Sequence, residues 1–223
     1  MLIIVQARMN SSRLPKKVLY QIKGKPLLKY LIARLSGTIE RKLCIATSKH
    51  TEDDEIKNLC FRENVSFFRG PLKDVSKRML NAANHFEADA FVRICGDSPL
   101  IDPKIVNRAI SIYQSGDYDL VTNTFPRSFP VGQSVEVIRT GTFEKAYEKM
   151  SEPEHFEHVT TYYYEHPDEF RIRNFANERD LSNYRLVVDT PEDLKRIEEI
   201  IVSMTKPHTE YSLDDLIDLY PST

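Results

Sequence analysis

The chain opens with Leu2-Ile3-Ile4-Val5-Gln6-Ala7-Arg8-Met9-Asn10-Ser11-Ser12-Arg13-Leu14-Pro15-Lys16-Lys17, an apolar run joined directly to a cationic loop. The run 2–7 predicts a buried strand. The turn that follows it carries four cations: Arg8, Arg13, Lys16 and Lys17. Small polar residues there let backbone N–H groups approach a polyphosphate while the cations neutralise it. The stretch therefore predicts an anion site, with a solvated basic loop as the alternative. It contains no Gly and matches neither a Walker A nor a Rossmann glycine pattern.

Short apolar runs alternate with amphipathic stretches through the first half of the chain. Further strands are predicted at 43–47, 65–68, 90–95 and 120–122, and helices at 27–35, 53–62 and 75–86. This strand–helix–strand rhythm predicts parallel pairing with right-handed crossovers. We therefore expect an α/β fold with a doubly wound, mostly parallel, Rossmann-like sheet, which binds its ligand beyond the carboxyl ends of the strands.

The rhythm changes after about residue 123. Strands are predicted at 135–139 and 170–174 and helices at 143–150 and 155–165, with prolines punctuating the connections. We interpret 124–183 as an inserted α+β layer that caps the site or makes a subunit contact. A last core strand at 184–188 and a helix at 191–204, with Thr190 as its N-cap, return to the core. The expectation is one domain over 1–223, with a core of 1–123 and 184–205.

Composition excludes several classes of protein. Of the 223 residues, 41% are hydrophobic and 29% are charged, which suits a folded domain rather than a disordered chain. The net charge of −2 provides no global field for nucleic acid, and no apolar run is long enough for a membrane span or a secretory leader. We expect a cytoplasmic protein. Its three separated cysteines, Cys44, Cys60 and Cys95, fit reduced thiols rather than disulfides or a zinc site.

A second group of candidate site residues follows the predicted strand 90–95. Gly96 lets a ligand approach, and Asp97 is placed at the strand's carboxyl end to bind Mg²⁺ that bridges phosphate oxygens. The alternative for Asp97 is an Asx-type turn before Pro99. Asp189 follows the predicted strand 184–188, and the sheet could bring it to the same edge. On its own residues it is equally well explained as a neighbour of a helix cap.

The blocks of sequence together resemble cytidylyltransferases of the 3-deoxy-manno-octulosonate cytidylyltransferase type, most nearly the spore coat polysaccharide biosynthesis protein F branch. The family pattern Q-A-R-x-G-S-x-R-L-P-G-K corresponds to residues 6–17. Asn10 and Lys16 stand where the family usually has Gly. The other matching blocks, in family order, are Gly24-Lys25-Pro26-Leu27, Ala46-Thr47-Ser48, Phe68-Arg69-Gly70, Gly96-Asp97-Ser98-Pro99-Leu100-Ile101, Glu157-His158-Val159-Thr160 and Val188-Asp189-Thr190-Pro191-Glu192-Asp193-Leu194.

The resemblance implies a nucleotide-diphospho-sugar transferase type of sheet and an enzyme that transfers CMP from CTP to a small, acidic sugar. It implies Mg²⁺ as cofactor, with Asp189 as the second metal carboxylate beside Asp97, and a homodimer. Arg8, Arg13, Lys17 and Asp97 would be catalytic. The nucleotide would be bound by Gln6, Ala7, Arg8, Asn10, Ser11, Ser12, Arg13, Lys17, Gly96 and Asp97.

On the sugar side, the resemblance points to Glu136, Glu157 and His158. His158 could orient a substrate hydroxyl or carboxylate, although a lone His on a helix is more often structural, and Glu136 could simply pair with an Arg. The D-x-D at Asp117 and Asp119 precedes a strand instead of ending one, so we interpret it as a turn.

Two further hypotheses stay open. One is a metal-dependent glycosyltransferase that uses a nucleotide-sugar, because a sheet of this type serves both functions. The other is a nucleotide-binding protein without turnover, which the residues Asn10 and Lys16 allow. The number of cations over 8–17 favours a triphosphate over a nucleotide diphosphate-sugar.

Overall fold

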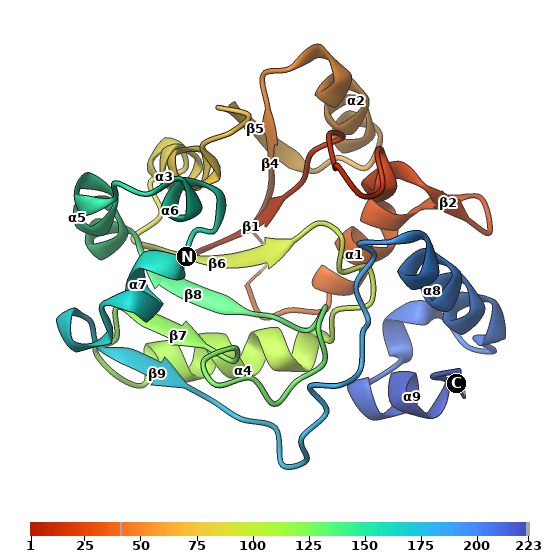
Figure 1. The fold of residues 1–223 in the computed structure, drawn as a ribbon. Coiled ribbons are helices and arrows are strands. Elements are labelled where there is room, and N and C mark those ends of the chain that lie inside the picture. The colour runs from red at the N-terminus through yellow and green to blue at the C-terminus, as the bar shows by residue number, and fades with distance from the viewer. Residues whose placement is uncertain (41, 222–223) are drawn as a thin grey trace.

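A computed structural model of the chain describes residues 1–40 and 42–221. At its centre is a seven-stranded sheet with the order β5-β4-β1-β6-β8-β7-β9 (Figure 1). The strands are β1 (Leu2–Gln6), β4 (Leu43–Ser48), β5 (Ser66–Gly70), β6 (Ala90–Cys95), β7 (Leu120–Thr122), β8 (Glu136–Arg139) and β9 (Ile172–Asn174). β5, β4, β1 and β6 pair in parallel, as do β7 and β9, and β8 is antiparallel to both of its neighbours. The prediction of a mostly parallel α/β sheet is confirmed.

Helices cover both faces of the sheet because its strands alternate apolar side chains between the faces. Ile3 and Val5 of β1 face one cluster of buried residues, and Leu2 and Ile4 face the other. The first cluster includes residues of α1 (Leu27–Leu35), α2 (Asp54–Arg62), α4 (Pro103–Gln114), α8 (Pro191–Ser203) and α9 (Leu213–Asp218). The second includes residues of α3 (Val75–His85), α5 (Thr140–Lys149) and α7 (Thr161–Glu165), with α6 (Pro153–Glu157) packed on α3. A small hairpin, β2 (Gln21–Ile22) and β3 (Lys25–Pro26), leads into α1.

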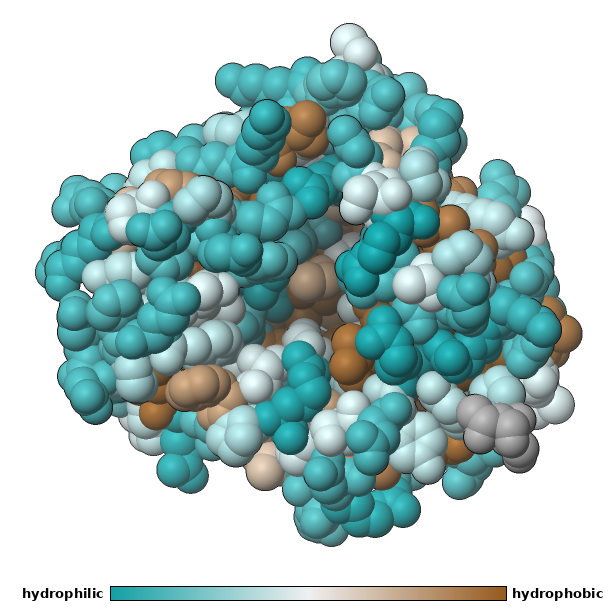
Figure 2. Space-filling model, in the orientation of Figure 1, coloured by the Kyte–Doolittle hydropathy of each residue, from teal (hydrophilic) through white to brown (hydrophobic). Residues whose placement is uncertain are grey.

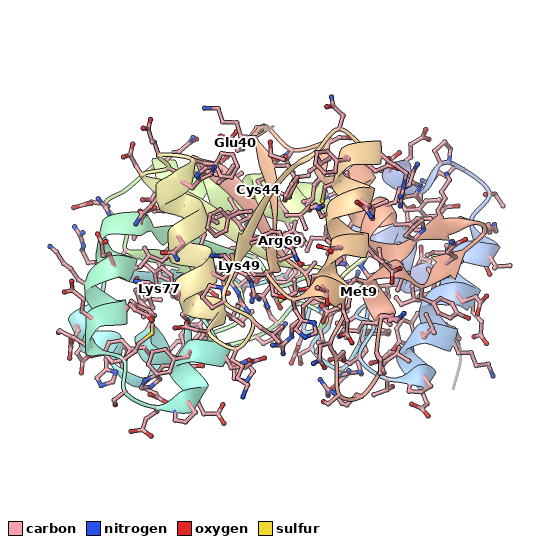
Figure 3. All side chains as sticks on the ribbon, turned by 90° about the horizontal axis from the view of Figure 1, so that it is seen from above. Met9, Glu40, Cys44, Lys49, Arg69 and Lys77 are labelled. Carbon is pink, nitrogen blue, oxygen red and sulfur yellow. The ribbon has the colours of Figure 1, made fainter. Side chains whose placement is uncertain are left out.

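The carboxyl ends of the parallel strands share one rim of the sheet. Figure 3 labels Met9, Lys49 and Arg69, which follow or end β1, β4 and β5, near the middle of the view, with Glu40 near its upper edge. The buried carboxylate of Asp53 ties this rim together, because it accepts hydrogen bonds from the Met9 N–H (2.7 Å) and the Ser48 N–H (3.0 Å). The loop after β1 is thereby fixed against the end of β4.

Two of the expected elements are wrong. Residues 184–188 form no strand: the Leu186 N–H donates to the Val131 carbonyl (2.7 Å) and the Val188 N–H to the Asp97 carbonyl (2.9 Å), so this segment pairs with loops. The sheet position beside β6 is taken by β8. The expected helix 155–165 is two short helices, α6 and α7, separated by residues 158–160. The other expected strands and helices are present, most with ends shifted by one to three residues.

The segment 124–183 belongs to the same sheet as the rest of the chain, since it supplies β8 and β9 together with α5, α6 and α7. Helix α8 is confirmed with its cap, in which Thr190 Oγ1 accepts from the Asp193 N–H at 3.2 Å. Within the residues described, no helix combines the length and the apolar character needed to cross a membrane. Cys44 and Cys60 are buried free thiols, and Cys95 is a partly buried one.

Candidate active site

A cavity of about 380 Å³ lies at the carboxyl ends of β1 and β6. Figure 2 shows the same face hollowed near its centre, over the region of β6 and β8, with hydrophilic residues around the opening. Most of the expected site residues line the cavity. They are Gln6, Ala7, Arg8, Ser11, Ser12, Arg13, Lys17, Gly96, Asp97, Glu157, His158 and Asp189. Asn10 and Glu136 are not among the lining residues.

Three charged side chains meet at the rim of this cavity. The Lys17 ammonium donates to Asp97 Oδ2 and to Asp189 Oδ1, each at 2.7 Å. Burial alone would lower the pKa of Lys17, but the two carboxylates overcome this and raise the pKa above its ordinary value. We call Lys17, Asp97 and Asp189 the rim cluster. It holds one positive and two negative charges, and each carboxylate has a second oxygen that Lys17 does not contact.

Local backbone contacts explain why two aspartates 92 positions apart in the sequence meet here. The Gly96 N–H donates to the Gln6 carbonyl at 2.8 Å, and a Cβ at Gly96 would lie 2.8 Å from that same oxygen. Asp97 is therefore held beside β1, and the Val188 N–H bonded to the Asp97 carbonyl brings Asp189 alongside. Asp193 then orients the second aspartate by accepting from the Asp189 N–H at 3.1 Å.

The loop after β1 surrounds the rim cluster with cations. Arg13 lies 3.2 Å from Asp189, and Arg8 forms an ion pair with Glu157 of α6 across the cavity. The left-handed turn of this loop falls at Lys16 (φ 61°) and not at Asn10. Lys16 points outward, with its ammonium 3.6 Å from Glu55 and 67% of its side chain exposed. The positive charge of the loop is thus directed into the cavity by Arg8, Arg13 and Lys17.

A second charged cluster forms part of the cavity floor through Arg93. Arg93 of β6 forms an ion pair with Glu136 of β8, directly opposite it in the antiparallel ladder. Thr160 Oγ1 and Tyr164 Oη each donate to the other carboxylate oxygen of Glu136 at 2.6 Å. Burial alone would raise the pKa of Glu136, but Arg93 and these hydrogen bonds lower it. We call Arg93, Glu136, Thr160 and Tyr164 the floor cluster.

Two cavity cations were missed by the sequence analysis. Arg93 interrupts the apolar run 90–95, and that interruption was the available signal. Arg78 lies on the buried face of α3, three residues after Val75, and its side chain is 1% exposed with Nε unpartnered in the described structure. Burial, helped by nearby Arg8, lowers the pKa of Arg78 to about 10.

The remaining candidates lie at the edges of the site. His158 lines the cavity with 62% of its side chain exposed, and its ring nitrogen is 3.6 Å from Glu154. The D-x-D carboxylates are structural, as expected: Asp117 pairs with Arg171, and Asp119 pairs with Arg171 at 2.9 Å. The described residues contain no group of three or more His, Cys, Asp or Glu side chains placed to hold a metal ion.

Comparison with known proteins gives a consistent result. A family model described as cytidylyltransferase matches residues 2–215. The spore coat polysaccharide biosynthesis protein SpsF of Bacillus subtilis is 31% identical over 209 residues, 89% of this chain and 85% of that protein. The solved structure of a cytidylyltransferase from Leptospira borgpetersenii is 32% identical, with a TM-score of 0.93 over 98% of this chain and 92% of that chain. CMP:2-keto-3-deoxy-manno-octonic acid synthetase in complex with CTP, at 18% identity, shares the fold (TM-score 0.69 over 90% of this chain and 98% of that one).

Proposed function

This chain belongs to the cytidylyltransferase family, and on that premise we propose that it transfers CMP from CTP to a sugar in the biosynthesis of a polysaccharide or cell-surface glycan. The observation that carries the proposal is the rim cluster: Lys17 bonded at 2.7 Å to both Asp97 and Asp189, in a cavity that Arg8 and Arg13 also line. The cations at this rim would bind the phosphates of a triphosphate, and the carboxylates would bind the metal ion that accompanies it.

The role of the protein in this reaction is to position the two substrates and to neutralise charge. A hydroxyl oxygen of the sugar bonds to the α-phosphorus of CTP, the bond from that phosphorus to the bridging oxygen breaks, and pyrophosphate leaves with those electrons. The hydroxyl proton passes to solvent. Arg8, Arg13 and Lys17 would hold the phosphates and stabilise the charge that develops on the leaving group.

Asp97 and Asp189 would hold Mg²⁺, and the donor set fits that ion. Mg²⁺ in nucleotide sites is bound through one or two carboxylates and completes its shell with phosphate oxygens and water. The rim cluster supplies two carboxylates, each with an oxygen free of Lys17. When bound, the ion would neutralise charge on the α-phosphate. The Lys17 ammonium now bonds to both carboxylates, and with Mg²⁺ in place it would serve the phosphates instead.

Pyrophosphate release tests the proposal directly. The protein is mixed with Mg²⁺, CTP and a panel of sugars, including 3-deoxy-manno-octulosonate, and pyrophosphate is measured with and without each sugar. We expect release that depends on one sugar and stops when EDTA removes Mg²⁺. Asp97→Asn should abolish it, and the matched variant Asp214→Asn, at an exposed aspartate whose ion-pair partner within the described part of the chain is Arg179, should not.

Other outcomes would identify the alternatives. Hydrolysis of a nucleotide-sugar without pyrophosphate release from CTP would favour a glycosyltransferase. A rise in melting temperature with CTP and Mg²⁺, with no product from any sugar, would favour a nucleotide-binding protein without turnover. The homodimer and the cytoplasmic location stay predictions, and sedimentation of the purified chain would test the first.

A further inference from the structure

Two cations of the cavity, Arg78 and Arg93, have no task in the proposed transfer, and Arg78 is bonded to the carbonyls of Pro71 and Leu72. Arg8, Arg13 and Lys17 come from a single loop, whereas Arg93 comes from the body of β6. Arg93 lies three positions before Gly96, which is about 10 Å of extended chain. Arg93 therefore lies beside the loop cations but toward β8, under the side of the cavity that residues of the segment 124–183 cover.

The floor cluster holds Arg93 in one orientation. Its Nε donates to Gln6 Oε1 at 3.0 Å, and its Nη1 is paired with Glu136. Both oxygens of Glu136 are used, one by Arg93 and the other by Thr160 and Tyr164. A guanidinium fixed on two of its sides is preorganised, so little rotamer entropy is lost when a ligand binds to the third.

Arg93 lines the cavity, and the third side of its guanidinium carries Nη2. Among the described residues, the hydrogen-bond partner of Nη2 is the Cys95 sulfur, at 3.7 Å, and sulfur is a weak acceptor. Burial raises the pKa of the Cys95 thiol to about 11, so the thiol is neutral and offers an S–H. Gln6 also lines the cavity, and its amide nitrogen has no acceptor among the described residues.

Arg93 Nη2, the Cys95 S–H and the Gln6 amide therefore give this part of the cavity a group of donors, while both oxygens of the neighbouring Glu136 are already used. A neutral sugar hydroxyl needs an acceptor for its own proton, which the fully used Glu136 does not provide. A carboxylate only accepts, and a guanidinium edge is its best partner in proteins. We propose that Arg93 is a specificity-determining residue that binds the carboxylate of an acidic acceptor sugar. The inference rests on the proposed function, whose CTP site it adjoins.

Direct binding measurements test the role of Arg93. Calorimetry with 3-deoxy-manno-octulosonate, N-acetylneuraminate and glucuronate, each against glucose as the neutral probe, is run with and without CTP. The variants are Arg93→Gln and, as a matched control, Arg173→Gln, an exposed arginine of β9 on the same sheet. We expect an acid to bind the wild type and Arg173→Gln, and to bind Arg93→Gln at least about tenfold more weakly. CTP affinity should change less than about twofold.

A double variant guards against loss of the fold. Arg93→Gln alone leaves the carboxylate of Glu136 buried without its cation, whereas Arg93→Gln with Glu136→Gln removes both charges and keeps amide hydrogen bonding. If the double variant melts like the wild type and still does not bind the acid, Arg93 is the residue that binds the carboxylate. Equal acid affinity in all variants, or no acid binding to a wild type that binds CTP, would overturn the proposal. Failure to bind CTP beside Arg93-dependent acid binding would count against the transferase function alone.

Discussion

The rim cluster and the floor cluster both pair cations with carboxylates, but they differ in how fully their charged atoms are hydrogen-bonded. In the floor cluster one guanidinium faces one carboxylate, and two hydroxyls satisfy the other carboxylate oxygen. In the rim cluster the Lys17 ammonium bonds to two carboxylates, Arg13 lies 3.2 Å from one of them, and about a fifth of each carboxylate side chain is exposed. Completed hydrogen bonding fixes a structure, whereas an incomplete cluster open to a cavity retains the capacity to bind a ligand.

The largest expected effect is on stability, from the floor cluster. Glu136→Leu would leave the Arg93 guanidinium buried without its carboxylate, and breaking a buried pair in this way costs about 4 kcal/mol. For a chain of this length that lowers the melting temperature by about 10 °C. Glu169→Leu, which removes an exposed partner of Lys149, is the control and should melt like the wild type. A Glu136→Leu protein that also melts like the wild type would contradict the structural role of the floor cluster.

In the rim cluster we expect a large effect of substitution on activity and a small effect on stability. Asp97→Ala should lower turnover about a hundredfold or more, on the order of 3 kcal/mol of transition-state stabilisation, with little change in melting temperature. Lys17 keeps Asp189 as a partner in this variant, so no buried cation is left unpaired. Steady-state pyrophosphate release and thermal melting of the same preparation measure both quantities. Near-normal release would remove Asp97 from the chemistry.

The two clusters should also lose their contributions to the stability of the fold at opposite ends of the pH scale. The pKa of Glu136 is lowered in the folded chain, so its stabilisation is present above about pH 4.3 and is lost as pH falls toward the folded value. The pKa of Lys17 is raised, so its stabilisation is present below about pH 10.4 and is lost as pH rises through the folded value. The melting-temperature gap between wild type and Glu136→Gln should shrink as the pH falls from about 7 to below about 4.3. The gap for Lys17→Met should instead close only above about pH 10. Gaps that do not change with pH would show that neither charge contributes.

The rim cluster was accessible to sequence analysis and most of the floor cluster was not, for a physical reason. Asp97 directly follows a strand, and parallel strands place such residues at a common edge whatever their side-chain packing. The family resemblance supplied Asp189, whose expected strand does not exist, because its position depends on loop pairing through Val188. Arg93 and Glu136 meet because β6 pairs with β8 in the antiparallel orientation. The residues of these two strands do not indicate that the strands become neighbours in the sheet. The break between α6 and α7 was hidden in the same way, because both halves carry helical periodicity.

The smallest expected effect concerns Lys16, where the family usually has Gly. Its left-handed backbone (φ 61°) strains a residue that carries a Cβ by about 1 kcal/mol, part of which glycine would return as entropy of the unfolded chain. Lys16→Gly should therefore raise the melting temperature by no more than about 2 °C. Lys23→Gly, at another exposed left-handed lysine (φ 47°) far from the cavity, should do the same and is the matched control for stability.

The informative quantity for Lys16→Gly is turnover. Because the Lys16 side chain points to Glu55 and away from the rim cluster, pyrophosphate release should be the same in Lys16→Gly, Lys23→Gly and the wild type. A rise of tenfold or more in Lys16→Gly alone would mean that the Cβ at this turn restricts phosphate approach.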